Sequence, residues 1–120
     1  MKRDKTDTLF SKFIRLLEGG YCKKCKKYFG LTQGLHCAHY FSRGRKSTRW
    51  YRDNATALCT HCHFDLDRHP EEKQEFFRKI LGKKRFEALC EREKELIKYT
   101  PDEIEAIEAD LKRKIKLLED

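Results

Sequence analysis

Residues 22–63 read CKKCKKYFGLTQGLHCAHYFSRGRKSTRWYRDNATALCTHCH, and this stretch decides the fold because a CxxC pair stands near each of its ends. Cys22 and Cys25 form the first pair, and Cys59 and Cys62 the second, with 33 residues between the pairs. Each pair can supply two thiolates from one tight turn, and four thiolates complete the tetrahedral shell that Zn²⁺ prefers. A complete shell leaves no position for a substrate, so we predict a structural zinc ion that clasps the segment.

The cysteines admit a second interpretation, in which they are ordinary buried or redox-active thiols, but two CxxC pairs rarely coincide by chance. Cys37 lies near enough in the chain to act as a substitute zinc ligand, whereas Cys90 falls on the apolar face of a predicted helix and is expected to be a small core residue. The sequence shows neither a signal-peptide-like opening nor an apolar run of membrane-spanning length. We therefore expect a cytoplasmic protein in which the six cysteines stay reduced.

The segment between the cysteine pairs is predicted to form a hairpin. Helical periodicity is lost between Leu35 and Cys59, and SRGRKS (residues 42–47) has the composition of an exposed turn between two extended arms. The rest of the chain is predicted to be helical over residues 7–18, again after Cys62, with Pro70 in a first helical turn and Gly82 at the helix end, and then over residues 83–99. A last helix begins at Thr100-Pro101-Asp102-Glu103, where Thr100 is the cap and Glu103 stands three residues after it. The expected fold class is α+β: a small two-stranded antiparallel hairpin plus helix, clasped by a zinc site and surrounded by helices.

The length and charge of the chain favour one modest domain. It has 120 residues, of which 40% are charged, so little of it is left to build a large core. We predict a zinc-stabilised domain over residues 1–99 and a C-terminal helix over residues 100–120. That helix carries a narrow apolar stripe, which is expected to pack on the domain or on a second copy of the chain: Ile104, Ile107, Leu111, Ile115 and Leu118.

The charge distribution favours a polyanionic partner. The net charge is +8, and because residues 101–120 carry seven acidic and four basic side chains, residues 1–100 carry +11. Nucleic acid is the usual partner of such a surplus, although ribosomal, chromatin and membrane-binding proteins share it. Within the hairpin loop, no acidic residue occurs from Phe41 to Arg52. We predict that the loop's basic residues grip DNA phosphates, the alternative being a merely solvated loop: Arg43, Arg45, Lys46, Arg49 and Arg52.

Three residues inside the clasped segment follow a recognisable order. His39, Asn54 and His63 stand with 14 and 8 residues between them, and His63 directly follows the last cysteine. This pattern resembles the HNH, or ββα-metal, endonucleases. More closely, HYFSRGRKSTRWYRDNATALCTHCH (39–63) and the tail YTPDEIEAIEADLKRKI (99–115) resemble the phage NinG/Rap recombination endonucleases. The cysteine spacing is also similar to that of the phage endonuclease VII resolvases.

The resemblance implies a role for each of the three residues. His39 would be the general base, His63 would ligate a catalytic Mg²⁺ or Mn²⁺ ion, and Asn54 would hold the hairpin so that the His39 ring stays aimed. Many HNH enzymes have an acidic ligand just before the base histidine, where this chain has Ala38. His36 is the first candidate for a second ligand, and an imidazole pair would favour Mn²⁺ or a later transition metal. Asp53 and Asp65 are alternatives, while His61 and His69 are expected to lie outside the site.

The function that the resemblance implies is metal-dependent hydrolysis of phosphodiester bonds in DNA. The expected substrate is branched or distorted DNA during phage recombination or repair, inside the bacterial host of a phage or prophage. Resolving a junction takes two cuts, which favours a homodimer. Two other interpretations stay open: a non-catalytic zinc-ribbon module that binds nucleic acid, and an adaptor whose final helix recruits a protein. The enzyme requires His39 and His63 to face one cleft, and the binding module does not.

Overall fold

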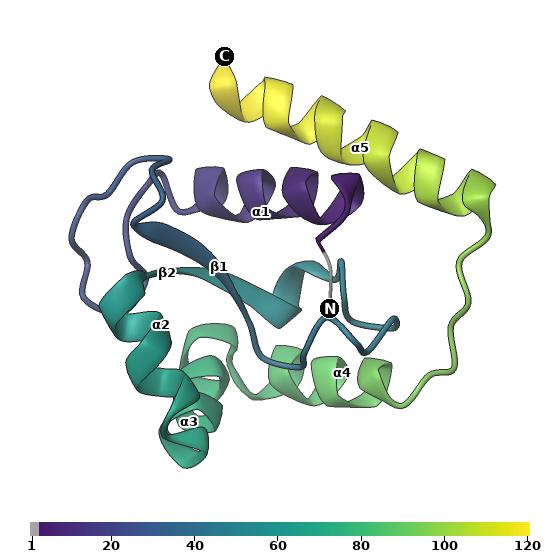
Figure 1. The fold of residues 1–120 in the computed structure, drawn as a ribbon. Coiled ribbons are helices and arrows are strands. Elements are labelled where there is room, and N and C mark those ends of the chain that lie inside the picture. The colour runs from purple at the N-terminus through teal and green to yellow at the C-terminus, as the bar shows by residue number, and fades with distance from the viewer. Residues whose placement is uncertain (1–2) are drawn as a thin grey trace.

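The computed structural model describes residues 3–120 and has an α+β architecture (Figure 1). Over that range, five helices accompany one two-stranded antiparallel sheet, as the sequence predicts. The elements are α1 (Lys5–Leu17), β1 (Leu35–His39), β2 (Ala55–Cys59), α2 (Thr60–Asp67), α3 (Pro70–Leu81), α4 (Lys83–Glu93) and α5 (Pro101–Glu119), with a short 3₁₀ turn over Arg52–Asn54.

The predicted hairpin is confirmed. Strand β1 pairs with β2 in a register that sets Leu35 opposite Cys59 and His39 opposite Ala55. The two strands are joined by the long loop of residues 40–54. Among the described residues no third strand pairs with the sheet, so the second edge of β1 is open. The register brings the last zinc-pair cysteines and the start of α2 beside the first residues of β1.

Apolar side chains pack on both sides of the sheet. In Figure 1, α1 and α5 lie above the sheet and α2, α3 and α4 lie below it. The lower cluster surrounds the cysteine pairs and includes Leu35, Ala38, Leu58 and Leu66. The upper cluster joins α1 to α5 and contains Phe10, Phe13, Ile14, Cys37, Leu111 and Ile115. The apolar stripe of α5 therefore packs on α1 of the same chain, while the predicted boundary between residues 99 and 100 stays a prediction.

Two helix boundaries differ from the sequence-based prediction. Helix α1 begins at Lys5 because Asp4 caps it, in a reciprocal box with Asp7. Helix α4 ends at Glu93, so the prediction of a helix to residue 99 is wrong. The helix ends where it meets the hairpin loop, since Arg92 Nε donates to the Ser47 carbonyl and Ser47 Oγ donates to the Glu93 carbonyl. Leu96, just beyond, is fully exposed and has no core to join.

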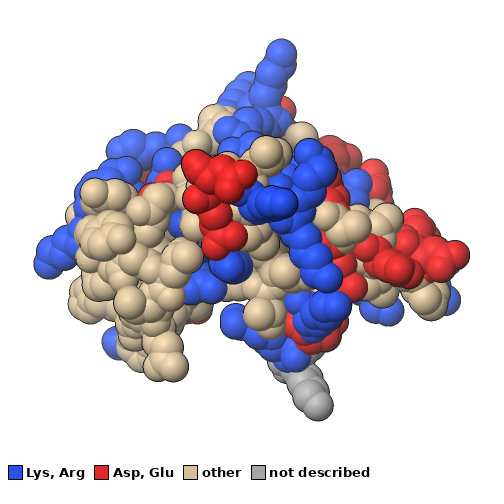
Figure 2. Space-filling view, turned by 90° about the horizontal axis from the view of Figure 1, so that it is seen from above, with Lys and Arg blue, Asp and Glu red and all other residues tan. Residues whose placement is uncertain are grey.

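The surface is strongly charged and unevenly so. Figure 2 shows the molecule from above, with many acidic side chains at the right, a further acidic group near the centre, and basic side chains at the top, the centre and the left edge. The acidic side corresponds to the first half of α5, which holds Asp102, Glu103, Glu105 and Glu108. Within residues 3–120, none of the helices combines the length and apolar character that crossing a bilayer requires.

Candidate metal centre and histidine cleft

The four predicted zinc ligands meet in one cluster. The sulfur atoms of Cys22, Cys25, Cys59 and Cys62 all lie within 4.8 Å of one another, and Cys25 Sγ is 3.9 Å from Cys59 Sγ. A tetrahedron with Zn–S bonds of about 2.3 Å has edges of about 3.8 Å, so the separation fits a zinc ion. Three of the four cysteines are buried and Cys25 is exposed. The cluster could thus hold a structural metal such as zinc.

Backbone amides point at the first sulfur of each cysteine pair. In each pair the second cysteine's N–H points to the first cysteine's sulfur: Cys25 N to Cys22 Sγ at 3.5 Å, and Cys62 N to Cys59 Sγ at 3.4 Å. Burial raises the pKa of Cys22, but amide donors from Cys59, Cys25 and Lys24 outweigh it and lower the pKa to about 7. Such donors stabilise thiolates, which are the metal-binding form of cysteine. At Cys59 and Cys62 burial prevails and raises the pKa.

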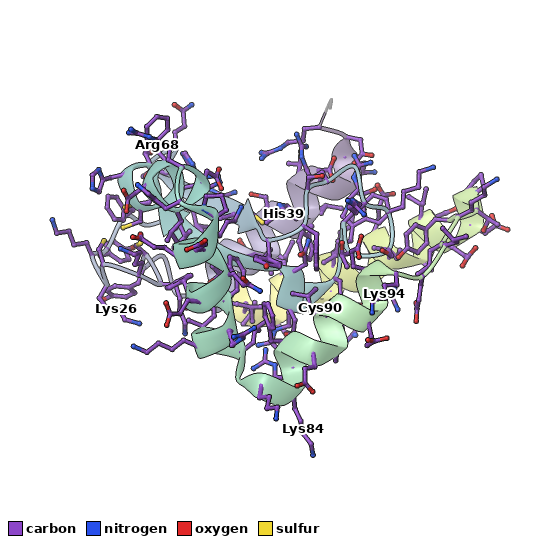
Figure 3. All side chains as sticks on the ribbon, turned by 90° about the horizontal axis from the view of Figure 1, so that it is seen from below. Lys26, His39, Arg68, Lys84, Cys90 and Lys94 are labelled. Carbon is purple, nitrogen blue, oxygen red and sulfur yellow. The ribbon has the colours of Figure 1, made fainter. Side chains whose placement is uncertain are left out.

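His39 occupies the end of β1, where its ring is held by the hairpin loop. Its Nε2 donates a hydrogen bond to the Arg49 carbonyl at 3.1 Å, because a carbonyl can only accept. Burial lowers the pKa of His39 to about 4, although the Arg49 carbonyl acts in the opposite direction. At neutral pH the ring is therefore uncharged, with its hydrogen on Nε2 and a lone pair on Nδ1. Figure 3 shows His39 near the centre of the molecule.

Asn54 ties the two ends of the hairpin loop together. Its side chain is fully buried and makes three hydrogen bonds with backbone groups. Oδ1 accepts from the Phe41 amide at 2.8 Å, and Nδ2 donates to the carbonyls of Phe41 at 2.9 Å and Thr48 at 3.0 Å. Thr48 directly precedes Arg49, whose carbonyl holds His39. Asn54 therefore fixes the backbone against which the His39 ring rests.

A buried carboxylate anchors the same loop to α1. Asp7 is only 3% exposed in its side chain, and it accepts hydrogen bonds from Arg49 Nη2 at 2.5 Å, Arg49 Nε at 2.9 Å and Trp50 Nε1 at 2.9 Å. Arg43 Nη1 also lies 3.4 Å from Asp7. Burial raises the pKa of Asp7, but the hydrogen bonds from Arg49, the Asp4 amide and Trp50 outweigh it and hold the pKa well below its usual range.

Replacing Asp7 with asparagine is expected to lower the free energy of unfolding by about 3 kcal/mol. The largely buried Arg49 would lose its short contacts with the buried Asp7 carboxylate and keep only the 3.4 Å contact with the exposed Asp4. The contribution of Asp7 is present above its unfolded pKa of about 3.9 and is lost as the pH falls through the folded value. Denaturant unfolding should therefore show a smaller difference in the free energy of unfolding between wild type and Asp7→Asn at pH 3 than at pH 7. Asp110→Asn is the control, since the exposed Asp110 also pairs with two cations, Arg113 and Lys114, and should change the free energy by less than about 0.5 kcal/mol.

His63 stands on α2 between two potential ligands. Its Nδ1 lies 2.9 Å from Nδ1 of His36, and its Nε2 lies 3.3 Å from an oxygen of Asp67, one helical turn further on. Burial lowers the pKa of His63, while Asp67 raises it, so the ring favours the neutral form that binds metals. One ion can bind only one nitrogen of a ring. His36 and Asp67 therefore mark two different positions around His63.

One cleft brings His39 and His63 together. It has a volume of about 340 Å³ and is lined by His39, His63 and Asp67, with Cys37, Arg43 and Lys73 around them. His36 does not line this cleft but faces the neighbouring one. The histidine cleft, as we call it, thus contains the predicted base, one predicted ligand and a carboxylate that the sequence-based reasoning missed. The spacing of Asp67 four residues after His63 on a predicted helix was the signal that could have identified it.

Most of the basic residues of the hairpin loop form ion pairs with carboxylates of the same chain. Arg49 pairs with Asp7 and Arg45 with Glu93, and Arg49 is only 12% exposed in its side chain. Lys46 and Arg52 are exposed. The prediction that this loop grips DNA stays a prediction, but Arg49 now has a structural role that uses its charge.

A comparison with protein families decides the relationship. The family model described as Bacteriophage Lambda NinG protein matches residues 2–120. The chain belongs to the NinG family. Membership indicates a role related to phage recombination. Neither the search of curated proteins nor the search of solved structures found a match.

The remaining residues that were singled out lie apart from the histidine cleft of this NinG-family chain. Asp53 pairs with Arg85 at 2.6 Å, and Asp65 lies in an exposed group with His69 and Glu72. His61 is exposed in the first turn of α2. Cys37 is outside the four-cysteine cluster, and burial raises its pKa to about 12, so it does not substitute for a zinc ligand. Cys90 is half-buried on α4 rather than fully in the core.

Proposed function

We propose that this protein is a metal-dependent DNA endonuclease of the HNH type that hydrolyses phosphodiester bonds in branched or distorted DNA during phage recombination or repair. The observation that carries the proposal is the histidine cleft, in which His39 and His63 face the same space beside Asp67. A protein that only binds nucleic acid has no use for this convergence. The structural metal at the cysteine cluster holds the hairpin and α2 together, and so keeps the two histidines in register.

His39 is the general base of the proposed reaction. Its Nε2 hydrogen is committed to the Arg49 carbonyl, and its Nδ1 has no hydrogen-bond partner among the described residues. That nitrogen takes a proton from the water that attacks the phosphorus atom. Asn54 and the Asp7–Arg49 pair keep the ring oriented through the loop backbone. They are positioning residues, since neither touches the substrate in this scheme.

His63 and Asp67 are the proposed ligands of a divalent ion in the cleft. The oxygen of Asp67 and Nε2 of His63 are 3.3 Å apart, a separation that two ligands of one ion can have. A mixed imidazole and carboxylate pair suits Mn²⁺ or Mg²⁺. When bound, the ion would stabilise the negative charge on the phosphate and on the leaving 3′ oxygen. His36 then holds the opposite nitrogen of His63 and fixes its ring, a supporting role.

The test is cleavage of a labelled four-way junction, beside a linear duplex, with Mn²⁺, Mg²⁺ or EDTA. Wild type and His39→Ala are compared after metal analysis shows that both keep zinc. Cuts that need the divalent ion and disappear in His39→Ala support the nuclease, and preference for the junction supports the recombination substrate. If neither protein cuts and both bind the junction equally, the chain is a zinc-ribbon binding module.

The pH dependence of cleavage is expected to be flat between pH 5.5 and pH 7.5. The base must be neutral, and burial lowers the pKa of His39 to about 4, so protonation removes activity only as the pH falls toward that value. Single-turnover rates at saturating metal would report this acidic limb. A rate that halves near pH 6.5 would mean that the base is an unperturbed imidazole.

A further inference from the structure

A second hollow continues the histidine cleft along the open edge of β1. It has a volume of about 450 Å³ and shares Arg3, Cys37 and His63 with the histidine cleft. We call it the arginine pocket. Its other walls come from α1, from the segment before β1 and from β1 itself: Ser11, Arg15, Leu31, Thr32, Gln33, Leu35 and His36.

The arginine pocket has the chemistry of an anion site. No aspartate or glutamate is among its lining residues, whereas hydrogen-bond donors from arginine, serine and glutamine are. Two other polar residues of the lining are already bonded, Thr32 to the Phe29 carbonyl and His36 to His63 and Thr60. Arg15 Nε donates to the Ser11 carbonyl at 3.2 Å, which orients the guanidinium, and within residues 3–120 no carboxylate forms an ion pair with Arg15. Phosphate contacts in nucleic-acid complexes come mainly from such side chains.

We propose that the arginine pocket binds a backbone phosphate next to the phosphate that is cleaved. A nucleic-acid strand would then run along the open edge of β1, over His63, from the arginine pocket into the histidine cleft. This inference rests on the proposed function, because it takes the histidine cleft as the place of cleavage. It assigns the recognition of the cleaved strand to α1 and the segment before β1.

The length of β1 between the two hollows agrees with this path of the nucleic-acid strand. His36 lines the arginine pocket and His39 lines the histidine cleft, three residues apart on β1. At about 3.3 Å per residue they are about 10 Å apart along the strand. Successive phosphates of one DNA strand advance by about 3.4 Å along the helix axis and are farther apart along the backbone. The separation of about 10 Å exceeds this axial advance, so the two hollows can hold different phosphates of one strand.

Charge also favours this path over the hairpin loop. Arg49 and Arg45 of the loop are paired with Asp7 and Glu93, so bringing a phosphate to them must compete with an existing ion pair. Arg15 has no such competitor among the described residues. A phosphate in the arginine pocket therefore gains a charge that the folded chain has not already neutralised.

The first test is binding of a labelled four-way junction in EDTA, measured by fluorescence anisotropy at several salt concentrations with zinc content verified. Arg15→Gln is expected to weaken binding about tenfold and to reduce the salt slope by about 0.9, the value for one phosphate contact. Arg113→Gln on α5 removes the same charge from an exposed site and should change the dissociation constant less than twofold. Equal behaviour of the two variants would overturn the proposal.

A second pair of variants separates phosphate binding from any effect on folding. Gln33 is exposed, so it accepts either charge without disturbing the core. Gln33→Glu is expected to weaken junction binding and Gln33→Lys to strengthen it, each about threefold. If both variants change junction affinity in the same direction, or neither changes it, the arginine pocket does not bind phosphate. These measurements need no cleavage. If the protein never cuts DNA but the two Gln33 variants change binding in opposite directions, phosphate binding in the arginine pocket is supported and the nuclease proposal is rejected.

Discussion

Cys62→Ser is expected to leave the protein unfolded at 25 °C. Apparent binding free energies of structural zinc in small domains are about 10–16 kcal/mol at pH 7, and a whole domain is typically stable by only about 5–15 kcal/mol. Cys62 is 4% exposed and its sulfur lies in the lower apolar cluster, so a serine there also buries a hydroxyl among Leu35, Leu58 and Leu66. Circular dichroism and zinc content, measured on the same sample, check the prediction.

Cys90→Ser is the matched control for this loss. Cys90 is half-buried on α4 and outside the cysteine cluster, so the variant should keep one zinc per chain and a melting temperature close to that of wild type. Removing the metal from wild type with a strong chelator should reproduce the Cys62→Ser result. A folded Cys62→Ser protein without zinc would show that the two apolar clusters suffice.

His39→Ala is expected to slow cleavage by a factor of about 10²–10⁴, the usual contribution of a positioned general base. The imidazole is half-buried in the histidine cleft, donates to the Arg49 carbonyl and lies 5.7 Å from the Phe10 ring, centroid to centroid. It makes no ion pair among the described residues, so its removal leaves the ligands His63 and Asp67 in place. Junction binding in EDTA should stay within about threefold of wild type. A single-turnover rate and a dissociation constant together distinguish loss of chemistry from loss of affinity.

His69→Ala is the control for this substitution. His69 is an exposed histidine at the start of α3 and contacts the Asp65 carbonyl, away from the histidine cleft. Its variant should cut at the wild-type rate. Equal loss of activity in both variants would point to a general effect of removing a histidine, and unchanged activity in His39→Ala would place the base elsewhere.

The cysteine cluster and the hairpin could be predicted from the sequence because both depend on local spacing. Two CxxC pairs define a metal site whatever surrounds them, and the loss of helical periodicity between them leaves a hairpin as the simplest connection. The start of the last helix is equally local, since Thr100 and Glu103 form a capping box there. For the same reason the end of α4 was missed, since Arg92 and Glu93 meet Ser47 across a large distance in sequence.

Part of the cleft could not be predicted because it depends on partners that are distant in the chain, whereas Asp67 was missed despite its local spacing from His63. Nothing near Asp7 in the sequence indicates that it pairs with Arg49, 42 residues later, and so takes an arginine out of the basic loop. His36 is only three residues from His39, but side chains alternate along a strand, so residues an odd number apart face opposite sides of the sheet. Helix α2 places Asp67, and not His36, in the same cleft as His39 and His63.

The packing of α1 on α5 sets the order in which parts of the chain can fold during synthesis. As the chain leaves the ribosome, residues 22–63 can close around a metal long before Leu111 and Ile115 exist. Until then the apolar face of α1, with Phe10, Phe13 and Ile14, packs on the hairpin alone and lacks the cover that α5 provides. Closing a loop of about a hundred residues is slow compared with local pairing. We therefore expect nascent chains that stop before residue 107 to be the species that chaperones hold and proteases remove.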